Sequence, residues 1–249
     1  PQVGKYALLN GAQIYYEEYG AGTPLLLIHG NSGSIQTMAY QIEYFKNKYR
    51  VIVADSRGHG KSQLKTDSLT YTQMARDWDA LVKHLALDSI NIIGWSDGGI
   101  IALKMGLVGQ SKIMKMVAMG ANLRPDSSAI HAWSVNDVVE AQKMIRAKIA
   151  AQDSTENWDL QKQLIGLLVD QPNIAPAELA SLKAKVLIIA GDEDFIRNEH
   201  TVEMYEHIPK AHLCIMPGET HSMPVSSPEL FNSIVYKFLK EPFKRPYSQ

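Results

Sequence analysis

Short apolar runs without polar interruption recur along the chain, and segments with helical patterns separate them. Such runs are typical of strands that are buried on both faces, as in a parallel sheet. Alternation of these strands with helices indicates βαβ units with right-handed crossovers. The sequence therefore predicts an α/β protein with a mostly parallel sheet. The predicted parallel strands cover residues 24–28, 50–54, 89–93, 116–119, 185–190 and 212–216.

Two further strands are predicted near the start of the chain, over residues 6–9 and 13–19, which makes eight in all. The pair Asn10-Gly11 between them tolerates the positive φ of a tight turn, so these two strands are expected to form a hairpin. Apolar side chains recur at helical spacing elsewhere and predict the flanking helices. These helices cover residues 72–86, 99–108, 199–207 and 228–240.

One long region interrupts this alternation. Residues 121–183 contain no strand candidate, whereas residues 134–150 and 157–169 have helical patterns. An insertion of this size between two strands is typical of a lid over one end of a sheet. We therefore expect an α/β core built from residues 1–120 and 184–249, with residues 121–183 inserted as a helical lid.

Composition limits the classes of function. The chain has 25 Lys and Arg against 26 Asp and Glu, a net charge of −1, and so lacks the basic surplus of a nucleic-acid-binding protein. The single cysteine, Cys214, excludes an internal disulfide and a cysteine zinc site. No apolar stretch reaches the ~18 residues of a membrane span. No signal peptide is visible, so a cytoplasmic location is the default, and export stays open because the chain begins with Pro1.

The segment Gly94-Trp95-Ser96-Asp97-Gly98 lies between a predicted strand and an apolar helix. Ligands of such sheets bind beyond the carboxyl ends of the strands. A serine in a sharp strand-to-helix turn, with small neighbours that relieve crowding, presents its hydroxyl above the sheet. The pattern predicts Ser96 as a nucleophile. The alternative is an ordinary turn with a helix-capping serine.

A nucleophilic serine needs a base and a carboxylate that orients it. Asp194 and His221 each follow a later predicted strand, so both are expected at the same end of the sheet as Ser96. Asp192 is the alternative acid. His131, in the expected lid, is predicted to line the pocket or to face water. The remaining lone histidines are expected to serve in packing or at the surface: His84, His200, His207 and His212.

The loop His29-Gly30-Asn31 follows the first parallel strand. Its Asn31 backbone N–H, together with that of Asp97, is predicted to form an oxyanion hole. His29 and Trp95 flank these groups and are candidates for substrate contact. Residues 55–62 are expected to support the same end of the sheet. Metal-binding spacing, a phosphate loop and a dinucleotide fingerprint are all missing from the sequence, so neither metal nor cofactor is expected.

Together these features resemble the α/β-hydrolase superfamily over nearly the whole chain. The resemblance is carried by His29-Gly30, the pattern of residues 55–62, the Ser96 turn, Gly191-x-x-Asp194 and the late His221. It implies the α/β-hydrolase fold, with an eight-stranded, mostly parallel sheet and a helical lid. Its Gly-x-x-Asp spacing favours Asp194 over Asp192 as the acid.

Residues 94–100 and 115–122 carry a narrower resemblance, to the valacyclovir hydrolase group of biphenyl hydrolase-like α-amino-acid ester hydrolases. In that group the acidic residue after the nucleophile holds the substrate's α-amino group, and the matching residue is Asp97. A carboxylate there opposes the developing oxyanion unless a substrate cation neutralises it. The alternative is that Asp97 only favours the start of a helix. The chain departs from the group in the lid and at Arg197-Asn198, so substrate identity does not transfer.

The sequence thus predicts a cofactor-independent serine hydrolase of small carboxylic esters, with α-amino-acid esters as the narrower option. A serine at position 96 disfavours the dehalogenases and epoxide hydrolases, whose nucleophile is an aspartate. Carbon–carbon bond hydrolases and cofactor-free perhydrolases stay open. So does a different class, a ligand-sensing receptor on the same fold. The sequence does not specify an oligomeric state.

Overall fold

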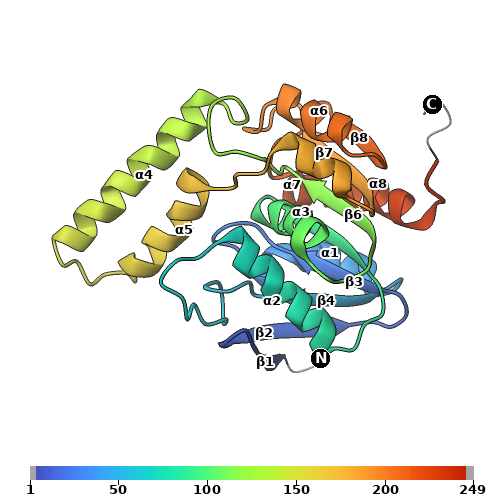
Figure 1. Cartoon of the computed structure of the whole chain (residues 1–249), viewed down its shortest axis with the longest axis horizontal. Coiled ribbons are helices and arrows are strands. Elements are labelled where there is room, and N and C mark those ends of the chain that lie inside the picture. The colour runs from blue at the N-terminus through green and yellow to red at the C-terminus, as the bar shows by residue number, and fades with distance from the viewer. Residues whose placement is uncertain (1–3, 245–249) are drawn as a thin grey trace.

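The computed structural model describes residues 4–244, and its centre is one eight-stranded sheet (Figure 1). The strands are β1 (Lys5–Leu9), β2 (Ala12–Tyr19), β3 (Pro24–Ile28), β4 (Arg50–Ala54), β5 (Ile90–Trp95), β6 (Ile113–Met119), β7 (Lys185–Gly191) and β8 (Ala211–Met216). Their order in the sheet is β1-β2-β4-β3-β5-β6-β7-β8. β2 pairs antiparallel with β1 and β4, and every other pair is parallel. The predicted fold class is therefore confirmed.

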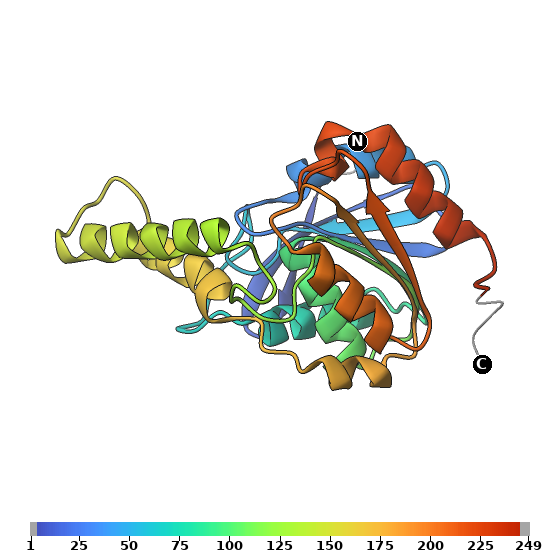
Figure 2. The same cartoon turned by 90° about the horizontal axis from the view of Figure 1, so that it is seen from above.

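Helices cover both faces of the sheet (Figure 2). They are α1 (Ala39–Phe45), α2 (Tyr71–His84), α3 (Asp97–Val108), α4 (Ala132–Ala150), α5 (Trp158–Asp170), α6 (Asn198–His207), α7 (Met223–Ser226) and α8 (Pro228–Lys240), with short 3-10 helices η1 (Ile35–Met38) and η2 (Pro176–Ser181). Alternate residues of each strand face opposite cores. Leu26 and Ile28 of β3 join the core under α2 and α3, whereas Leu25 and Leu27 join the core under α1 and α8.

The hairpin at the start of the chain is as predicted. Leu9 pairs with Ala12, and the two turn residues, Asn10 and Gly11, have φ values of +46° and +82°. Other boundaries differ from the sequence analysis. β6 begins at Ile113, three residues earlier than predicted, and α3 begins at Asp97, before the predicted start at residue 99.

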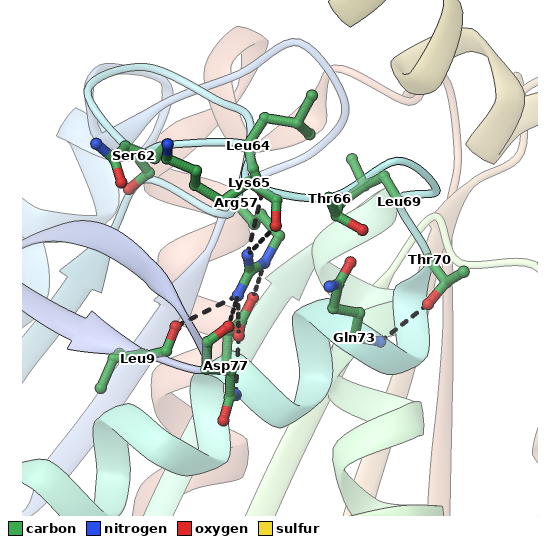
Figure 3. A network of polar contacts seen from close by, with 12 residues as sticks. Leu9, Arg57, Ser62, Leu64, Lys65, Thr66, Leu69, Thr70, Gln73 and Asp77 are labelled. Atoms are coloured by element: carbon green, nitrogen blue, oxygen red, sulfur yellow. Dashed lines mark hydrogen bonds and ion pairs between the residues drawn. The ribbon is translucent and has the colours of Figure 1, made fainter.

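A buried ion pair fixes the loop that follows β4 (Figure 3). Arg57 donates from Nε and Nη2 to the two carboxylate oxygens of Asp77, at 2.6 and 2.7 Å. The same guanidinium donates to the backbone carbonyls of Leu9, Asn10 and Leu64. These bonds join the loop, the β1–β2 turn and α2, so the loop supports the sheet end as the sequence analysis expected.

A helical insertion, made of α4 and α5 within residues 121–183, connects β6 to β7 and extends beyond one end of the sheet (Figure 2). α4 packs along α5, and Ile145 is its one buried side chain. Two glutamines, Gln163 in α5 and Gln171 directly after it, tie this helix to the core. Gln163 accepts from the Leu69 N–H, and Gln171 donates to the Leu69 carbonyl. Among the described helices, none is long and apolar enough to cross a membrane.

Candidate active site

Ser96 lies in the sharp turn between β5 and α3. Its φ of +59° and ψ of −122° fall in a region that non-glycine residues rarely adopt. The Ser96 N–H donates to the carbonyl of Met119, and the Ser96 carbonyl accepts from the N–H groups of Gly99 and Ile100. These bonds hold the strained backbone in place between two strand ends.

The glycines beside Ser96 are required by close backbone approach. A Cβ on Gly98 would lie 2.0 Å from the carbonyl oxygen of Ile28, and a Cβ on Gly94 would lie 2.1 Å from the carbonyl oxygen of Gly98. Both distances are too short for any side chain. The loop after β3 also lies against the turn, since a Cβ on Gly30 would be 3.0 Å from Ser96 Cβ.

His221 and Asp194 meet at the same end of the sheet. His221 Nδ1 lies 2.8 Å from Asp194 Oδ1, which also accepts from the Ile196 N–H. A buried carboxylate on Nδ1 favours the tautomer that carries its proton there and leaves Nε2 free to act as a base. Asp192, the alternative acid, instead accepts from the Gly218 N–H at 2.6 Å and stabilises a turn.

The His221 ring is held by neighbours as well as by Asp194. Phe195 stacks against it, with ring centroids 3.9 Å apart and planes 33° from parallel. A Cβ on Gly120 would lie 2.7 Å from His221 Nδ1, so the backbone there also contacts the ring. Trp95 Nε1 donates to the His221 carbonyl at 2.8 Å.

Asp97 is a buried carboxylate, 2 % exposed. Its Oδ1 accepts from the Tyr71 hydroxyl at 2.8 Å, and its Oδ2 accepts from Asn31 Nδ2 at 2.9 Å. Burial raises the pKa of Asp97 to about 6, although the bonds from Tyr71 and Asn31 lower it in part. None of the ion pairs among residues 4–244 involves this carboxylate. Ionisation of Asp97 is therefore unfavourable unless a ligand supplies a positive charge.

The two predicted oxyanion-hole residues lie side by side. Asn31 donates from its amide to Asp97 and also to the Leu164 carbonyl in α5, at 3.1 Å. Asp97 is the first residue of α3, where backbone N–H groups have no acceptor within the helix. Within the described chain, no hydrogen bond uses the backbone N–H of Asn31 or Asp97. Both N–H groups can therefore donate to a ligand.

A cavity of about 260 Å³ lies between the turn and the helical insertion. Ser96, Asp97 and Tyr71 supply polar lining from the core. The insertion supplies mainly apolar side chains, among them Val135, Val138, Val139, Leu168 and Val169. A space of this size and lining suits a small, partly apolar ligand with a polar group beside Ser96.

His29 and Trp95 are not among the residues that line this cavity. His29 is buried, its Nε2 accepts from the Ser56 N–H, and its Nδ1 contacts the Gly30 carbonyl at 2.7 Å. Burial lowers the pKa of His29 to about 3, so the ring is neutral. With both nitrogens occupied, His29 joins two loops, and Trp95 joins the turn to the loop of His221.

Three features of the site were not predicted from the sequence. They are the Tyr71 bond to Asp97, the bridge made by the Asn31 side chain, and the stacking of Phe195 on His221. Each joins elements that are distant in sequence or depends on side-chain direction, so spacing gave no signal for it.

Among residues 4–244, no group of three or more His, Cys, Asp or Glu side chains could hold a metal ion.

Comparison with known proteins finds a matching family model and several similar proteins. The alpha/beta hydrolase fold family model matches residues 23–139. Human serine hydrolase BPHL is 28 % identical over 248 residues, which cover 93 % of this chain and 84 % of BPHL. A thermophilic esterase from Thermogutta terrifontis has a similar structure, with a TM-score of 0.78, 21 % identity, and coverage of 98 % of this chain and 100 % of the esterase. A meta-cleavage product hydrolase from Pseudomonas fluorescens IP01 gives a TM-score of 0.74 and 20 % identity, with 95 % and 97 % coverage.

Proposed function

Because the chain has the α/β-hydrolase fold and resembles the α/β-hydrolase superfamily, we propose that it is a serine hydrolase of small carboxylic esters. The observation that carries the proposal is the His221–Asp194 hydrogen bond, which lies at the same sheet end as a serine on a strained turn that lines a cavity. The similar human protein BPHL is a serine hydrolase, which supports the same reaction class.

In the proposed mechanism, His221 Nε2 takes the Ser96 Oγ proton while Oγ attacks the ester carbonyl carbon. The carbonyl oxygen becomes an oxyanion, to which the N–H groups of Asn31 and Asp97 donate. Asp194 holds the His221 tautomer and stabilises the imidazolium. His221 then protonates the leaving alcohol, which departs and leaves an acyl group on Ser96. Water, activated by His221, releases the acid and restores the serine.

We assign residues 121–183 to a lid that closes the cavity. Support comes from the apolar side chains that α4 and α5 place opposite Ser96. The bond from Asn31 to the Leu164 carbonyl also links the insertion to the loop proposed to bind the oxyanion. A lid of this kind would exclude water from the reacting ester and strengthen the electrostatic interactions there.

A second proposal concerns the substrate class, which we infer to be α-amino-acid esters. Asp97 lines the cavity next to Ser96, and its buried carboxylate has only neutral donors around it. A buried charge without a counter-charge is unfavourable, so a substrate ammonium would stabilise it. The resemblance to the α-amino-acid ester hydrolases points to the same contact.

The direct test is hydrolysis of short p-nitrophenyl esters by Ser96→Ala. We expect turnover to fall by about 10⁴-fold or more with the fold retained, as for other serine nucleophiles. Ser233→Ala, at an exposed position on α8, is the matched control. Retained turnover in Ser96→Ala would contradict the proposal. A single slow turnover by the wild type would favour a ligand-sensing receptor, and cleavage of diketones but not esters would favour a carbon–carbon bond hydrolase.

A further inference from the structure

Phe195 contacts the cavity and His221 and is the chain neighbour of Asp194. It follows Asp194 directly in the chain, it lines the cavity, and its ring centroid lies 3.9 Å from that of His221, with the two planes tilted by 33°. The other aromatic neighbour of His221, Trp95, is farther away, with centroids 6.4 Å apart and planes 45° from parallel. Phe195 is therefore the aromatic group in closest contact with the proposed base.

The backbone around Phe195 is fixed on both sides. Its carbonyl accepts from the His131 N–H at 2.8 Å, and Ile196 forms a bridge with Ile130. The Arg197 N–H donates to the Ala129 carbonyl at 2.9 Å. These bonds pair the Asp194 loop with the segment that leads into α4. The Phe195 backbone is thereby fixed relative to both Asp194 and the start of the insertion.

We propose that Phe195 is a positioning residue for His221, which keeps the imidazole plane fixed and stabilises its protonated form during the reaction. This inference rests on the proposed function of Ser96 and His221. An aromatic face carries partial negative charge, and a cation within about 6 Å of the ring centroid is attracted to it. In the proposed mechanism, His221 becomes a cation as the Ser96 Oγ proton moves to Nε2 and Oγ bonds to the carbonyl carbon. The interaction therefore strengthens in the transition state and acts on kcat and not on KM.

The test replaces Phe195 with 4-fluoro-, 3,5-difluoro- and 3,4,5-trifluorophenylalanine. Fluorine withdraws electron density from the ring face while the ring keeps nearly the same shape. We expect kcat and kcat/KM for a p-nitrophenyl ester to fall together with each added fluorine. The total loss should be about five- to tenfold, a size typical of a partly buried cation–π contact. KM should stay within about twofold.

Two substitutions of Phe195 by standard amino acids and one control substitution complete the experiment. Phe195→Leu removes the ring and should lose at least as much kcat as the trifluoro variant, whereas Phe195→Tyr should keep most of the wild-type kcat. Leu168→Ala enlarges the same cavity, and no ring or polar contact joins Leu168 to His221. Leu168→Ala should therefore change mainly KM. Melting temperatures of all variants report whether the fold is retained.

If kcat stays the same across the fluorinated series, the proposed role of Phe195 is overturned, because the ring would then act through its shape and not through the charge on its face. A rise in KM that accounts for the whole loss would overturn it too, because the ring would act only as a cavity wall. These failures are distinct from failure of the proposed function. Retained turnover in Ser96→Ala refutes the serine mechanism, whereas an inactive Ser96→Ala with a flat fluorine series refutes the Phe195 inference alone.

Discussion

Two of the buried aspartates, Asp77 and Asp97, lie on the neighbouring helices α2 and α3 and differ in what surrounds them. Asp77 on α2 and Asp97 at the start of α3 are both less than 5 % exposed, and both oxygens of each carboxylate accept hydrogen bonds. Asp77 faces the guanidinium of Arg57, which is equally buried (Figure 3). Asp97 faces only a hydroxyl and an amide, from Tyr71 and Asn31.

We interpret this difference as one between a structural carboxylate, Asp77, and a carboxylate that we propose to bind a ligand, Asp97. The remaining donors of Arg57 reach backbone carbonyls, so the Asp77 pair is complete within the protein. Asp97 lines the cavity and has no internal counter-charge among the described residues. A buried charge that the protein leaves unpaired is expected where a charged ligand will complete it.

Asp77→Asn should have the largest effect, on stability. It removes the counter-charge of Arg57 and leaves a buried guanidinium, which typically costs about 3–5 kcal/mol. Urea unfolding of Asp77→Asn measures the loss. The exposed Asp67→Asn is the control, with an expected change within about 0.5 kcal/mol. A loss below about 1 kcal/mol for Asp77→Asn would show that this pair is not the structural anchor we describe.

The pH dependence of stability should report the unpaired state of Asp97. Its pKa is raised from 3.8 to about 6 in the folded protein, so the folded state holds the proton more tightly than the unfolded state. The protonated Asp97 carboxyl therefore contributes its full stabilisation of the fold below about pH 4. This contribution to the free energy of unfolding is lost as the pH rises through about 6, by about 3 kcal/mol in total. The comparison is wild type minus Asp97→Asn, by urea unfolding from pH 4 to 7, because other titrating groups cancel in the difference.

No change in that difference with pH would mean that Asp97 already has a cationic partner or is well solvated. A difference of opposite sign, in which the wild type gains stability relative to Asp97→Asn as the pH rises, would mean that the carboxylate is stabilised as an anion. Either result would remove the contrast with Asp77.

Substrate preference should be the next effect in size. At pH 7 the wild type should cleave L-alanine benzyl ester about 10- to 100-fold faster than benzyl propionate in kcat/KM, because a charge-assisted hydrogen bond contributes about 1.5–3 kcal/mol. Asp97→Asn should bring this ratio close to one. The wild-type ratio should also fall as the pH drops through about 6, where Asp97 takes up a proton. Equal rates for the two esters in the wild type would refute the α-amino-ester proposal and leave the serine mechanism standing.

Tyr71→Phe should have the smallest effect. The variant removes the hydroxyl that donates to Asp97 Oδ1 but keeps the ring. Loss of this bond should raise the pKa of Asp97 further and move the pH at which the amino-ester preference is half lost upward, with a stability loss of about 1 kcal/mol. The same pH series of kcat/KM ratios measures the shift. A shift toward lower pH would contradict the role given to Tyr71.

The sequence predicted all eight strands, because the six parallel strands are short apolar runs and the turn pair Asn10-Gly11 marks the hairpin of the first two. α1 was not predicted, because its seven residues bury only Gln41, Ile42 and Phe45 and depend on packing against α7 and α8. α3 begins at Asp97, two residues earlier than predicted, and includes Gly98, a poor helix former that is present because a Cβ there would lie 2.0 Å from the carbonyl oxygen of Ile28. Tertiary packing overrides local preference in both cases.

The same reasoning applies to the site. Strand-end positions predicted where Ser96, Asp194 and His221 would lie, because parallel strands end together at one edge. Contacts between side chains from distant elements could not be predicted in this way. Tyr71 reaches Asp97 from the first turn of α2, and Asn31 reaches Leu164 in the insertion. His29 and Trp95 were expected at the substrate, yet their ring nitrogens bond within the protein.

The most direct test of the serine mechanism is to locate the covalent adduct of a fluorophosphonate probe by mass spectrometry. We predict one adduct per chain, on Ser96, at a rate that falls steeply in His221→Ala. Ser134 lines the same cavity and provides an internal comparison, since it lacks the contacts of Ser96 with the sheet ends. Labelling of Ser134 in place of Ser96, or labelling of Ser96 at an unchanged rate in His221→Ala, would contradict the account.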